Sequence, residues 1–534
     1  MSIPIIDLFA GPGGLGEGFS SIYDKSGNRS FDIRLLIEKD RNAHQTLELR
    51  SFFRKFPKGC APDEYYEIYR ANSVKKRGHL KEELFKKYPD EYNTAKAEAW
   101  NAELGSENFP SELIDKKIQK ALKDSNNWVL IGGPPCQAYS LVGRSRNQWR
   151  DNVDENEPKV HLYKEYLRVI AAHHPSVFVM ENVKGLLSSR LNGKKIFHLI
   201  LNDLQKPGEV FHQYESPDYK IFSLVEEPLE YVDGQPIYRS DEDYLIKSED
   251  YGIPQKRHRI ILLGIREDLC DRIEMIKPLS ETSDQINIKS VIGDLPKIRS
   301  ALNREYIGDI EKDGKIKRYY RNLKDTPDKW VQLINEFLSE ILSINGLNES
   351  AKNLSISIPE CGKGSEFLIC ETPSLDNPLK SWYRDPKIGG ISHHESRSYL
   401  IDDLKRYLFA SIYSVTNDRF PRLDEYARYD LLPEHKNALS GKFADRFRVQ
   451  LPDDPATTIT SHISKDGHYF IHYDPRQCRS LTVREAARIQ TFPDNYLFCG
   501  SRTSQYHQVG NAVPPLLAWK IAETVRDLFE AIYV

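Results

Sequence analysis

Short apolar runs alternate with stretches of helical periodicity over the first half of the chain. Five of these runs predict buried strands, at residues 3–10, 34–37, 128–131, 177–180 and 259–265. Apolar positions at helical spacing follow the first run and recur at 161–173. Strands separated by helices predict an α/β fold with a doubly wound, mostly parallel sheet.

The pattern changes twice further along the chain. Residues 52–110 are rich in Lys, Glu and Tyr with little alternation, which predicts a helical insertion on the surface. From 281 to 480 the apolar runs shorten and polar stretches lengthen, which predicts a smaller, irregular domain. Helical periodicity then returns and ends in an amphipathic helix at 516–532. We therefore expect a main domain at 1–280 that is completed by 481–534.

Composition narrows the class of protein. The 534 residues are 39% hydrophobic and 29% charged, with a net charge of −3, which is ordinary for a soluble protein. The apolar runs are too short to span a bilayer, and the first residues do not resemble a signal peptide. The seven cysteines form no C-x-x-C pair, so we expect a reduced, cytoplasmic protein without disulfides or a metal site. A nucleic-acid binder with this charge must gather its basic residues on one surface.

A glycine-rich turn follows the first predicted strand. Gly11, Gly13 and Gly16 match the G-x-G-x-x-G pattern, and Glu38 ends the next predicted strand. A glycine turn followed by an acid at this distance is typical of a site for an adenosine-containing cofactor, where the acid meets the ribose. On these residues alone, an NAD-dependent dehydrogenase is one reading.

A cysteine lies just beyond another predicted strand. The sequence Gly-Gly-Pro-Pro-Cys-Gln at 132–137 follows the apolar run 128–131. Two prolines fix the backbone, so Cys136 is held rigidly at the edge of the sheet where ligands bind. Cys136 is therefore a candidate nucleophile, although a free cysteine is also often a small buried hydrophobe.

Three further motifs carry polar side chains at similar places. Glu181 follows the apolar run 177–180, and a buried glutamate can act as a general acid. Gln255, Arg257 and Arg259 share one face of an extended segment, from which an arginine can grip a carboxylate. Asn511 precedes the last predicted helix and can cap it.

In this order, the motifs resemble those of the DNA (cytosine-5)-methyltransferases. The matching segments are 7–16, Glu38, 133–137, 181–183, 255–259, 484–493 and 508–514. In that family the glycine loop, the acid of the second strand and the last segment bind S-adenosylmethionine. The resemblance implies that the residues binding this cofactor are Asp7, Phe9, Ala10, Gly11, Gly13, Gly14, Glu38, Pro135, Asn511 and Ala512. The family's acid after strand three, which contacts the adenine, is left unassigned.

The resemblance also implies a mechanism. Cys136 would add to C6 of cytosine, Glu181 would protonate ring N3, and Arg257 and Arg259 would complete the catalytic set. Because C5 is inaccessible in a stacked duplex, the base must be flipped out.

The family's target recognition domain corresponds to the irregular region, 281–480. The side chains expected to contact DNA are Gln137, Ser140, Arg144, Arg146, Gln255, Arg446 and Arg448.

The expected partner is double-stranded DNA, with a cognate restriction or defence system beside it, and we expect a monomer. Three alternatives stay open. A tRNA cytosine-5 methyltransferase shares these motifs, although the large recognition region argues against it. An NAD-dependent dehydrogenase does not explain the cysteine, glutamate and C-terminal motifs together. A DNA-binding protein with an inactive methyltransferase fold would not need Cys136, Glu181 and Arg259.

Overall fold

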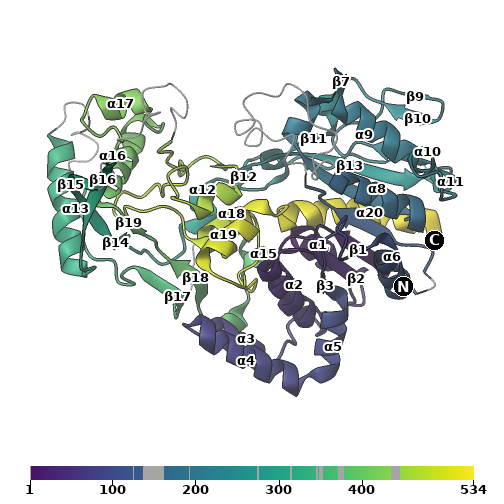
Figure 1. The fold of residues 1–534 in the computed structure, drawn as a ribbon, viewed down its shortest axis with the longest axis horizontal. Coiled ribbons are helices and arrows are strands. Elements are labelled where there is room, and N and C mark those ends of the chain that lie inside the picture. The colour runs from purple at the N-terminus through teal and green to yellow at the C-terminus, as the bar shows by residue number, and fades with distance from the viewer. Residues whose placement is uncertain are drawn as a thin grey trace.

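A mostly parallel sheet forms the centre of the main domain in the computed structural model (Figure 1). The structure describes residues 2–123, 125–135, 161–191, 193–273, 276–312, 315–343, 347, 353–370, 378–433 and 446–533. Among these residues, eight strands form the sheet in the order β11-β13-β5-β4-β1-β2-β3, with β8 paired to β13. Their bounds are β1 Ile3–Leu8, β2 Phe31–Glu38, β3 Ala99–Asn101, β4 Val129–Gly132, β5 Val177–Val183, β8 Tyr219–Phe222, β11 Leu245–Lys247 and β13 His258–Arg266.

Strand direction brings the functional motifs to one edge of this sheet. β3, β2, β1, β4 and β5 run parallel, whereas β13 runs antiparallel to β5. The carboxyl ends of β1, β2, β4 and β5 therefore lie at the same edge as the first residues of β13. The doubly wound α/β fold expected from the sequence is confirmed.

Helices cover both faces of the sheet because alternate strand residues point to opposite sides. Ile5 and Val179 belong to one apolar core with α1 (Gly14–Ser20) and α20 (Pro515–Tyr533). Ile6 and Met180 belong to a second core. The helices of that second core are α6 (Ser111–Leu122), α8 (His161–His173) and α9 (Ile196–Gln205).

The described residues of 281–480, called here the distal unit, lie beside the main domain (Figure 1). Their own apolar core contains Trp330, Leu408 and Phe447. The longer elements are β15 (Arg304–Lys312), β16 (Lys315–Asn322), α13 (Pro327–Leu342), β17 (Gly364–Leu368), β18 (Ile391–Glu395), α16 (Ile401–Asn417) and α17 (Leu423–Ala427). The shorter ones are α12 (Ile288–Ile292), β14 (Ala301–Leu302), α15 (Lys380–Tyr383), η5 (Pro386–Ile388), β19 (Ser398–Tyr399), β20 (Ala456–Thr457) and η6 (Ser461–Ser464).

The last part of the chain joins the two units. The helices α18 (Val483–Ile489) and α19 (Arg502–Asn511) share an apolar core with α12. In addition, β12 (Gln255–Lys256) pairs in parallel with β20 of the distal unit. Short elements complete the main domain: β6 (Arg190–Leu191), β7 (Lys194–Lys195), α10 (Pro207–Val210), β9 (Glu230–Val232), β10 (Gln235–Ile237) and α11 (Glu267–Cys270), with the 3-10 turns η2 (Lys184–Ser188), η3 (Asp241–Tyr244) and η4 (Ser248–Tyr251).

The insertion at 52–110 is more than a surface addition. Its helices are the end of α2 (Arg41–Arg54), then α3 (Asp63–Arg70), α4 (Val74–Lys87) and α5 (Pro89–Glu98). Tyr65, Tyr66 and Tyr69 are buried in one core with Phe367 and Ile388 of the distal unit. The insertion therefore bridges the main domain and the distal unit on the lower side of Figure 1.

Polar contacts strengthen this bridge. Arg77 lies 2.7 Å from the carboxylate of Glu366, and the Tyr66 hydroxyl donates to Asp385 at 2.8 Å. Among the described residues, no helix is both long and apolar enough to cross a membrane.

Candidate active site

Glu181 lies beside the turn that leads to Cys136. β4 and β5 are neighbours, with Gly132 opposite Met180, so Gly133 and Glu181 follow at adjacent positions. A Cβ on Gly133 would lie only 2.9 Å from Oε2 of Glu181. The glycine thus leaves room for the carboxylate next to Pro134 and Pro135. The expected cofactor residue Pro135 is the last described residue before Cys136, which lies outside the described residues together with Gln137, Ser140, Arg144 and Arg146.

Arg259 is the ionic partner of Glu181. Its Nε lies 2.7 Å from Oε1 of Glu181, and the two side chains are only 13% and 14% exposed. Burial lowers the pKa of Arg259, and the nearby carboxylate partly offsets this. Arg259 also donates from its Nη1 to the carbonyl of His258 at 2.8 Å. The guanidinium therefore holds the carboxylate at the edge of the sheet.

Arg257 and Gln255 are buried and contact other segments of the chain. Arg257 donates to the carbonyl oxygens of Ile459 at 2.8 Å and Gly510 at 3.3 Å, so it holds these segments together. Gln255 is fully buried and hydrogen-bonded to Gln490 at 2.8 Å. The catalytic role of Arg257 and the DNA contact of Gln255 stay predictions. The chain breaks its extended pattern between β12 and β13, and the three side chains do not share one face.

The glycine loop and Glu38 form the opposite part of the edge. Glu38 Oε2 accepts from the amide of Gly11 at 2.8 Å, and Oε1 accepts from the amide of Asp40 at 2.7 Å. Each carboxylate oxygen retains a further lone pair for a hydroxyl group. Burial raises the pKa of Glu38, while the two amides act in the opposite direction. Gly13 has φ of 91° and lies so close to Leu47 and the Tyr496 hydroxyl that a Cβ would not fit.

Two features of this loop fit a ligand. Next to Gly11, with φ of 56°, no atom lies within 4 Å of where a Cβ would be. Phe9 has φ of 57°, a conformation that costs energy for a side chain of this size and often marks a functional turn. Ala10 between them donates its amide to the carbonyl of Ile37 at 3.1 Å, which ties the loop to the end of β2.

Asp7 is a buried acid at the end of β1. It is fully buried, and neither carboxylate oxygen has a hydrogen-bond partner among the described residues. Desolvation raises its pKa well above the usual value, although Arg54 acts against this. A buried acceptor without a donor is costly, so its retention fits a site that is completed by a further group.

The segment after α19 returns to the same loop. A Cβ on Gly14 would lie 2.1 Å from the carbonyl oxygen of Val513, so these two backbones touch. Ala512 is buried and Asn511, the last residue of α19, is exposed. The structure thus brings the expected C-terminal segment beside the glycine loop.

Sequence reasoning missed the buried charges of α18. Arg488 pairs with Asp494 at 2.8 Å and with Asp294 at 2.6 Å, and Glu485 pairs with Arg479 at 2.7 Å. All are buried, so this helix ties the distal unit to the main domain through ion pairs. The available signal was the repeated charge pattern of 484–488 on an otherwise apolar helix.

The third strand of the sheet ends in an amide side chain and not in an acid. β3 ends at Asn101, whose Nδ2 donates to the carbonyls of Glu38 at 2.8 Å and Lys39 at 3.0 Å. An amide side chain therefore stands at the end of β3. Asp115, in α6, contacts Arg168 and His173, each at 2.8 Å.

The expected DNA contacts of the distal unit are half-buried. Arg446 Nη2 lies 3.6 Å from Asp466, and Arg448 lies over the ring of Phe420 at 5.1 Å. Both flank the buried Phe447, which fixes their backbone in the core of the unit. Their role toward DNA stays a prediction.

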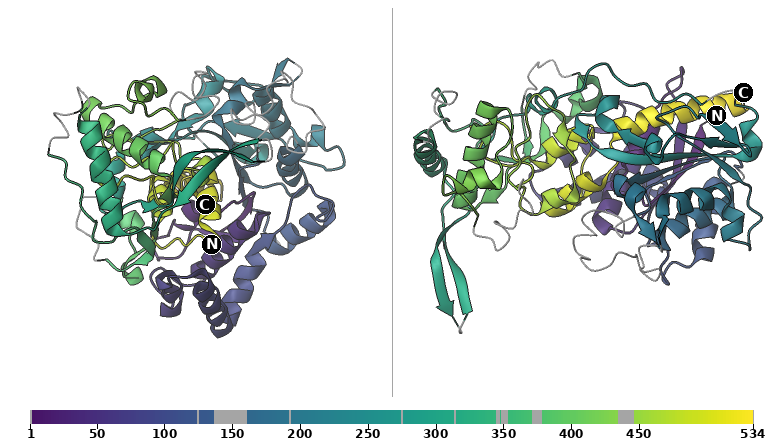
Figure 2. Two further views of the ribbon diagram at one scale, coloured as in Figure 1. Left: turned by 60° about the vertical axis from the view of Figure 1, so that its left-hand side comes forward. Right: turned by 90° about the horizontal axis from the view of Figure 1, so that it is seen from above.

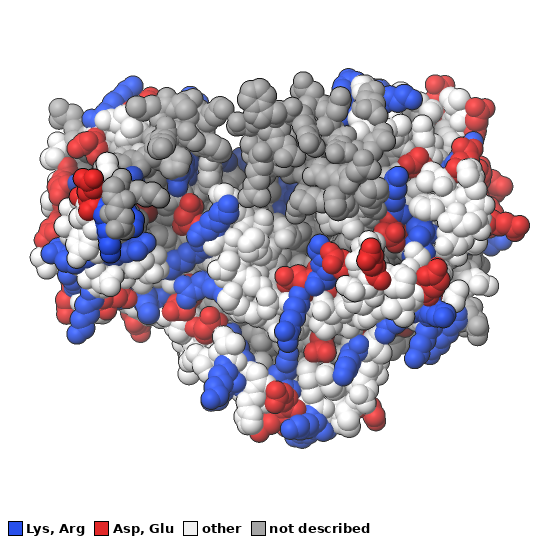
Figure 3. Space-filling model, in the orientation of Figure 1, with Lys and Arg blue, Asp and Glu red and all other residues white. Residues whose placement is uncertain are grey.

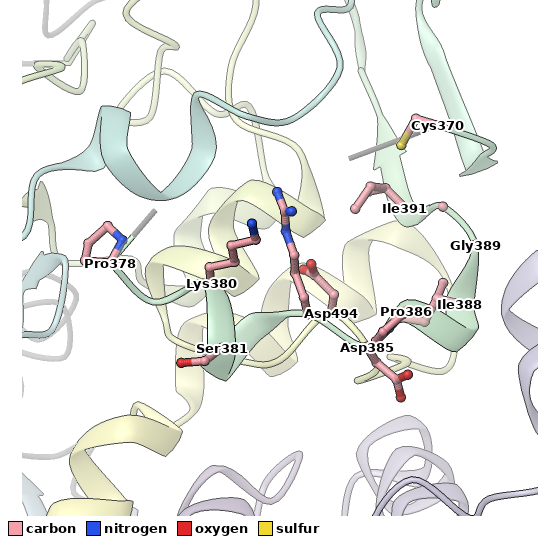
Figure 4. Close-up of a pocket in the computed structure, with 12 residues that line it drawn as sticks. Cys370, Pro378, Lys380, Ser381, Asp385, Pro386, Ile388, Gly389, Ile391 and Asp494 are labelled. Carbon is pink, nitrogen blue, oxygen red and sulfur yellow. The ribbon is translucent and has the colours of Figure 1, made fainter. Parts of the chain in front are cut away.

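A cavity of about 690 Å³ lies away from this edge (Figure 4). Lys380, Asp385, Ile391 and Asp494 line it, so it belongs to the border between the distal unit and the loop after α18. None of its lining residues belongs to the glycine loop or to the Glu181–Arg259 pair.

Known proteins are similar to this chain in sequence. The family described as C-5 cytosine-specific DNA methylase matches residues 90–527. The type II methyltransferase M.Bpa9945I of Bacillus paralicheniformis is 31% identical over 98% of each chain. The DNA (cytosine-5-)-methyltransferase M.ApeKI of Aeropyrum pernix is 26% identical over 76% of this chain and 82% of its own. Among solved structures, the Entamoeba histolytica methyltransferase EhMeth aligns over the whole of both chains with 14% identity and a TM-score of 0.41.

The family match spans most of the chain, and the first relative is matched over nearly its whole length. The dehydrogenase reading is therefore not favoured. The chain belongs to the C-5 cytosine-specific DNA methylase family and is a DNA (cytosine-5-)-methyltransferase.

Proposed function

We propose that this protein methylates C5 of a cytosine flipped out of duplex DNA, with S-adenosylmethionine as methyl donor and Cys136 as covalent nucleophile. The observation that carries the proposal is the position of Glu181. Its carboxylate is paired to Arg259 and lies against Gly133, in the turn that leads to Cys136. A proton-handling group beside the turn that precedes the proposed nucleophile in the chain matches the needs of this reaction.

The chemistry of cytosine assigns roles to these side chains. Addition of the Cys136 thiolate to C6 forms an S–C bond and pushes electrons toward C5 and N3. A proton placed at N3 by Glu181 neutralises the charge that this addition creates. Arg259 keeps the Glu181 carboxyl oriented toward the base. Once C5 carries the transferred methyl group, loss of the C5 proton to a base, return of the N3 proton to Glu181 and release of the thiolate restore the aromatic ring.

The described residues fit the proposed cofactor. Glu38 offers carboxylate lone pairs for ribose hydroxyls, and the space beside Gly11 is open. Asp7 is a buried acceptor without a partner, and the 511–513 segment closes the loop from the other side. When bound, S-adenosylmethionine supplies an electrophilic methyl group on a sulfonium.

The context proposed for this activity is a restriction-modification or other defence system, in which the protein acts as a monomer in the cytoplasm. The restriction-modification context is supported by the names of two relatives, which are type II methyltransferases. Ser140, Arg144 and Arg146, which lie outside the described residues, are proposed to contact the DNA.

The test replaces the nucleophile. The Cys136→Ser variant should lose methyl transfer to duplex DNA and keep its affinity for S-adenosylmethionine, because only a thiolate is nucleophilic enough at neutral pH. Cys60→Ser, which changes an exposed cysteine of the insertion, is the matched control and should keep full activity. DNA with 5-fluorocytosine at the methylated position should trap a covalent adduct with the native protein alone. Activity of the serine variant, or transfer to tRNA in preference to DNA, would contradict the proposal.

A further inference from the structure

A two-stranded ribbon projects from the distal unit away from the rest of the molecule. It is formed by β15 and β16, which pair antiparallel from Arg304 opposite Asn322 to Lys312 opposite Lys315. Figure 2, right, shows the ribbon extending well beyond the body. Nine residues at about 3.3 Å each give β15 a length of roughly 30 Å.

The outer half of this ribbon does not pack on a core. Ile310, Ile316 and Tyr319 are 44%, 77% and 52% exposed. An isolated pair of strands is marginally stable, and exposed strand edges favour unwanted association. An exposed ribbon of this kind lowers the stability of the fold, and its presence therefore indicates that it binds a partner.

The inner half is stiffened by side-chain contacts. The rings of Tyr306 and Tyr320 lie 5.8 Å apart, and the Arg304 guanidinium lies 4.5 Å from the Tyr320 ring centre. On the other side, Arg321 pairs with Glu305 at 2.5 Å. The ribbon therefore leaves the distal unit in a fixed direction.

The register gives the two faces of the ribbon different charge. Glu305, Ile310, Lys312, Lys317 and Tyr319 share one face with Arg321, because cross-strand partners point to the same side. On this face Lys312, Lys317 and Arg321 outnumber the single acid Glu305, which gives the face a net positive charge. We call it the lysine face.

The opposite face has balanced charge. Arg304 and Arg318 share it with Asp309 and Glu311. Figure 3, in which the ribbon points toward the viewer at the left, shows basic side chains gathered on one side of it, while elsewhere on this surface both signs are interspersed. Because the whole chain has a net charge of −3, a general excess of basic residues does not explain this local group of basic side chains.

We propose that the lysine face of the β15–β16 ribbon binds the phosphate backbone of duplex DNA outside the recognised sequence. The chain acts on DNA, and cations interleaved with an exposed aromatic ring complement a polyanion. The length of the ribbon equals roughly nine base-pair steps of 3.4 Å, which is enough to follow DNA beyond a short target. Phosphate contacts of this kind raise affinity without adding sequence preference.

The test compares two variants with the same change in charge. Lys312→Gln/Lys317→Gln removes two charges from the lysine face, and Arg304→Gln/Arg318→Gln removes two from the opposite face of the same ribbon. Binding is measured by fluorescence anisotropy at several salt concentrations, on duplexes of about 12 and about 40 base pairs that hold the methylated site at one end or at the centre. Circular dichroism and melting temperature check that each variant is folded.

The proposal expects a specific pattern. Two lost phosphate contacts reduce the slope of log affinity against log salt by about 1.8, so between 50 and 200 mM salt the native protein loses roughly tenfold more affinity than the lysine variant. This difference should occur on the long duplex and vanish on the short one, and the arginine variant should keep the native slope. Methylation of the same duplexes by the native protein is measured separately, so a failure of the proposed reaction is distinguishable.

Three outcomes would overturn the proposal. Equal slopes for the lysine variant and the native protein would show that this face does not contact phosphates. Equal losses in both variants would indicate a general effect of charge. A change in sedimentation coefficient on lysine substitution, without a change in DNA binding, would assign the ribbon to contacts between protein copies.

Discussion

Replacing Gly133 by alanine tests whether the position of the Glu181 carboxylate controls the reaction. The new Cβ would lie 2.9 Å from Glu181 Oε2 but 3.8 Å from both the Cβ and the carbonyl oxygen of Glu181. Carbon and oxygen need about 3.4 Å or more, so the carboxylate must move by roughly half an ångström. The end of a side chain can make this shift, and we expect the melting temperature to stay within a few degrees.

Gly133→Ala should change the rate of the reaction more than it changes the stability of the fold. A misplacement of about 1 Å can cost roughly a hundredfold in rate, so half of that predicts a loss of about tenfold in kcat. Removal of the proton-handling group in Glu181→Ala should cost roughly 100- to 10,000-fold. Single-turnover methylation with labelled S-adenosylmethionine and saturating DNA measures the chemical step directly.

A double variant and a matched glycine give the controls. If Gly133→Ala acts through Glu181, it should have little further effect in the Glu181→Ala background, because the two changes then share one cause. Gly208→Ala, where the nearest atom would be 3.6 Å from the Cβ, should leave kcat unchanged. Additive losses in the double variant, or a Gly133→Ala protein with native kcat, would refute the reasoning.

Three other perturbations test separate parts of the structure. Glu38→Ala should weaken S-adenosylmethionine by about 1.5–3 kcal/mol in isothermal titration, because a charged hydrogen-bond acceptor is lost. Burial lowers the pKa of His394 from 6.5 to about 4, so the unfolded state binds a proton that the folded state excludes, and the melting temperature should fall as pH decreases from 6.5 toward 4. Arg77→Met should destabilise the protein by about 1–3 kcal/mol in a denaturant titration, because Glu366 loses its buried partner.

The three predictions are tested against control variants or against a result that would contradict them. Glu103→Ala changes an exposed acid near Glu38, and equal affinity in both variants would move the ribose contact elsewhere. His394→Gln should reduce the pH dependence without abolishing it, because burial also lowers the pKa of His393 and His472 to about 4. A constant melting temperature in the native protein between pH 7 and 5 would contradict the assignment. Lys75→Met removes an exposed charge from the helix of Arg77 and should leave stability unchanged.

Local sequence patterns identified those parts of the site that lie at the end of a single strand. The glycine turn, Glu38 and Glu181 each follow an apolar run, and parallel strands bring such positions to one edge without further information. The pairing of Arg259 with Glu181 was implied by the family resemblance, and the structure brings the two together because Arg259, near the start of β13, lies opposite the end of β5.

Features that depend on distant partners were not accessible from sequence. The tyrosines of α3 suggested a polar surface, because their apolar partners Phe367 and Ile388 lie some three hundred positions later in the chain. The period of two predicts Gln255, Arg257 and Arg259 on one face, but the chain turns at Arg257, and the side chains of Gln255 and Arg257 lie in the interior. A local pattern cannot show where an extended segment ends or which residues will cover it.

The contact between the first and last helices has a consequence for the timing of activity. Gly18 of α1 lies against Pro515, Ala518 and Trp519, where a Cβ would come within 2.4–2.5 Å of α20, and Gly14 lies against Val513. The residues that lead into the glycine loop are synthesised well before α20, which supplies the surface on which they pack. A nascent chain that does not yet contain α20 therefore holds this loop without its neighbouring core. We expect methyl transfer to require that α20 has been synthesised and packed.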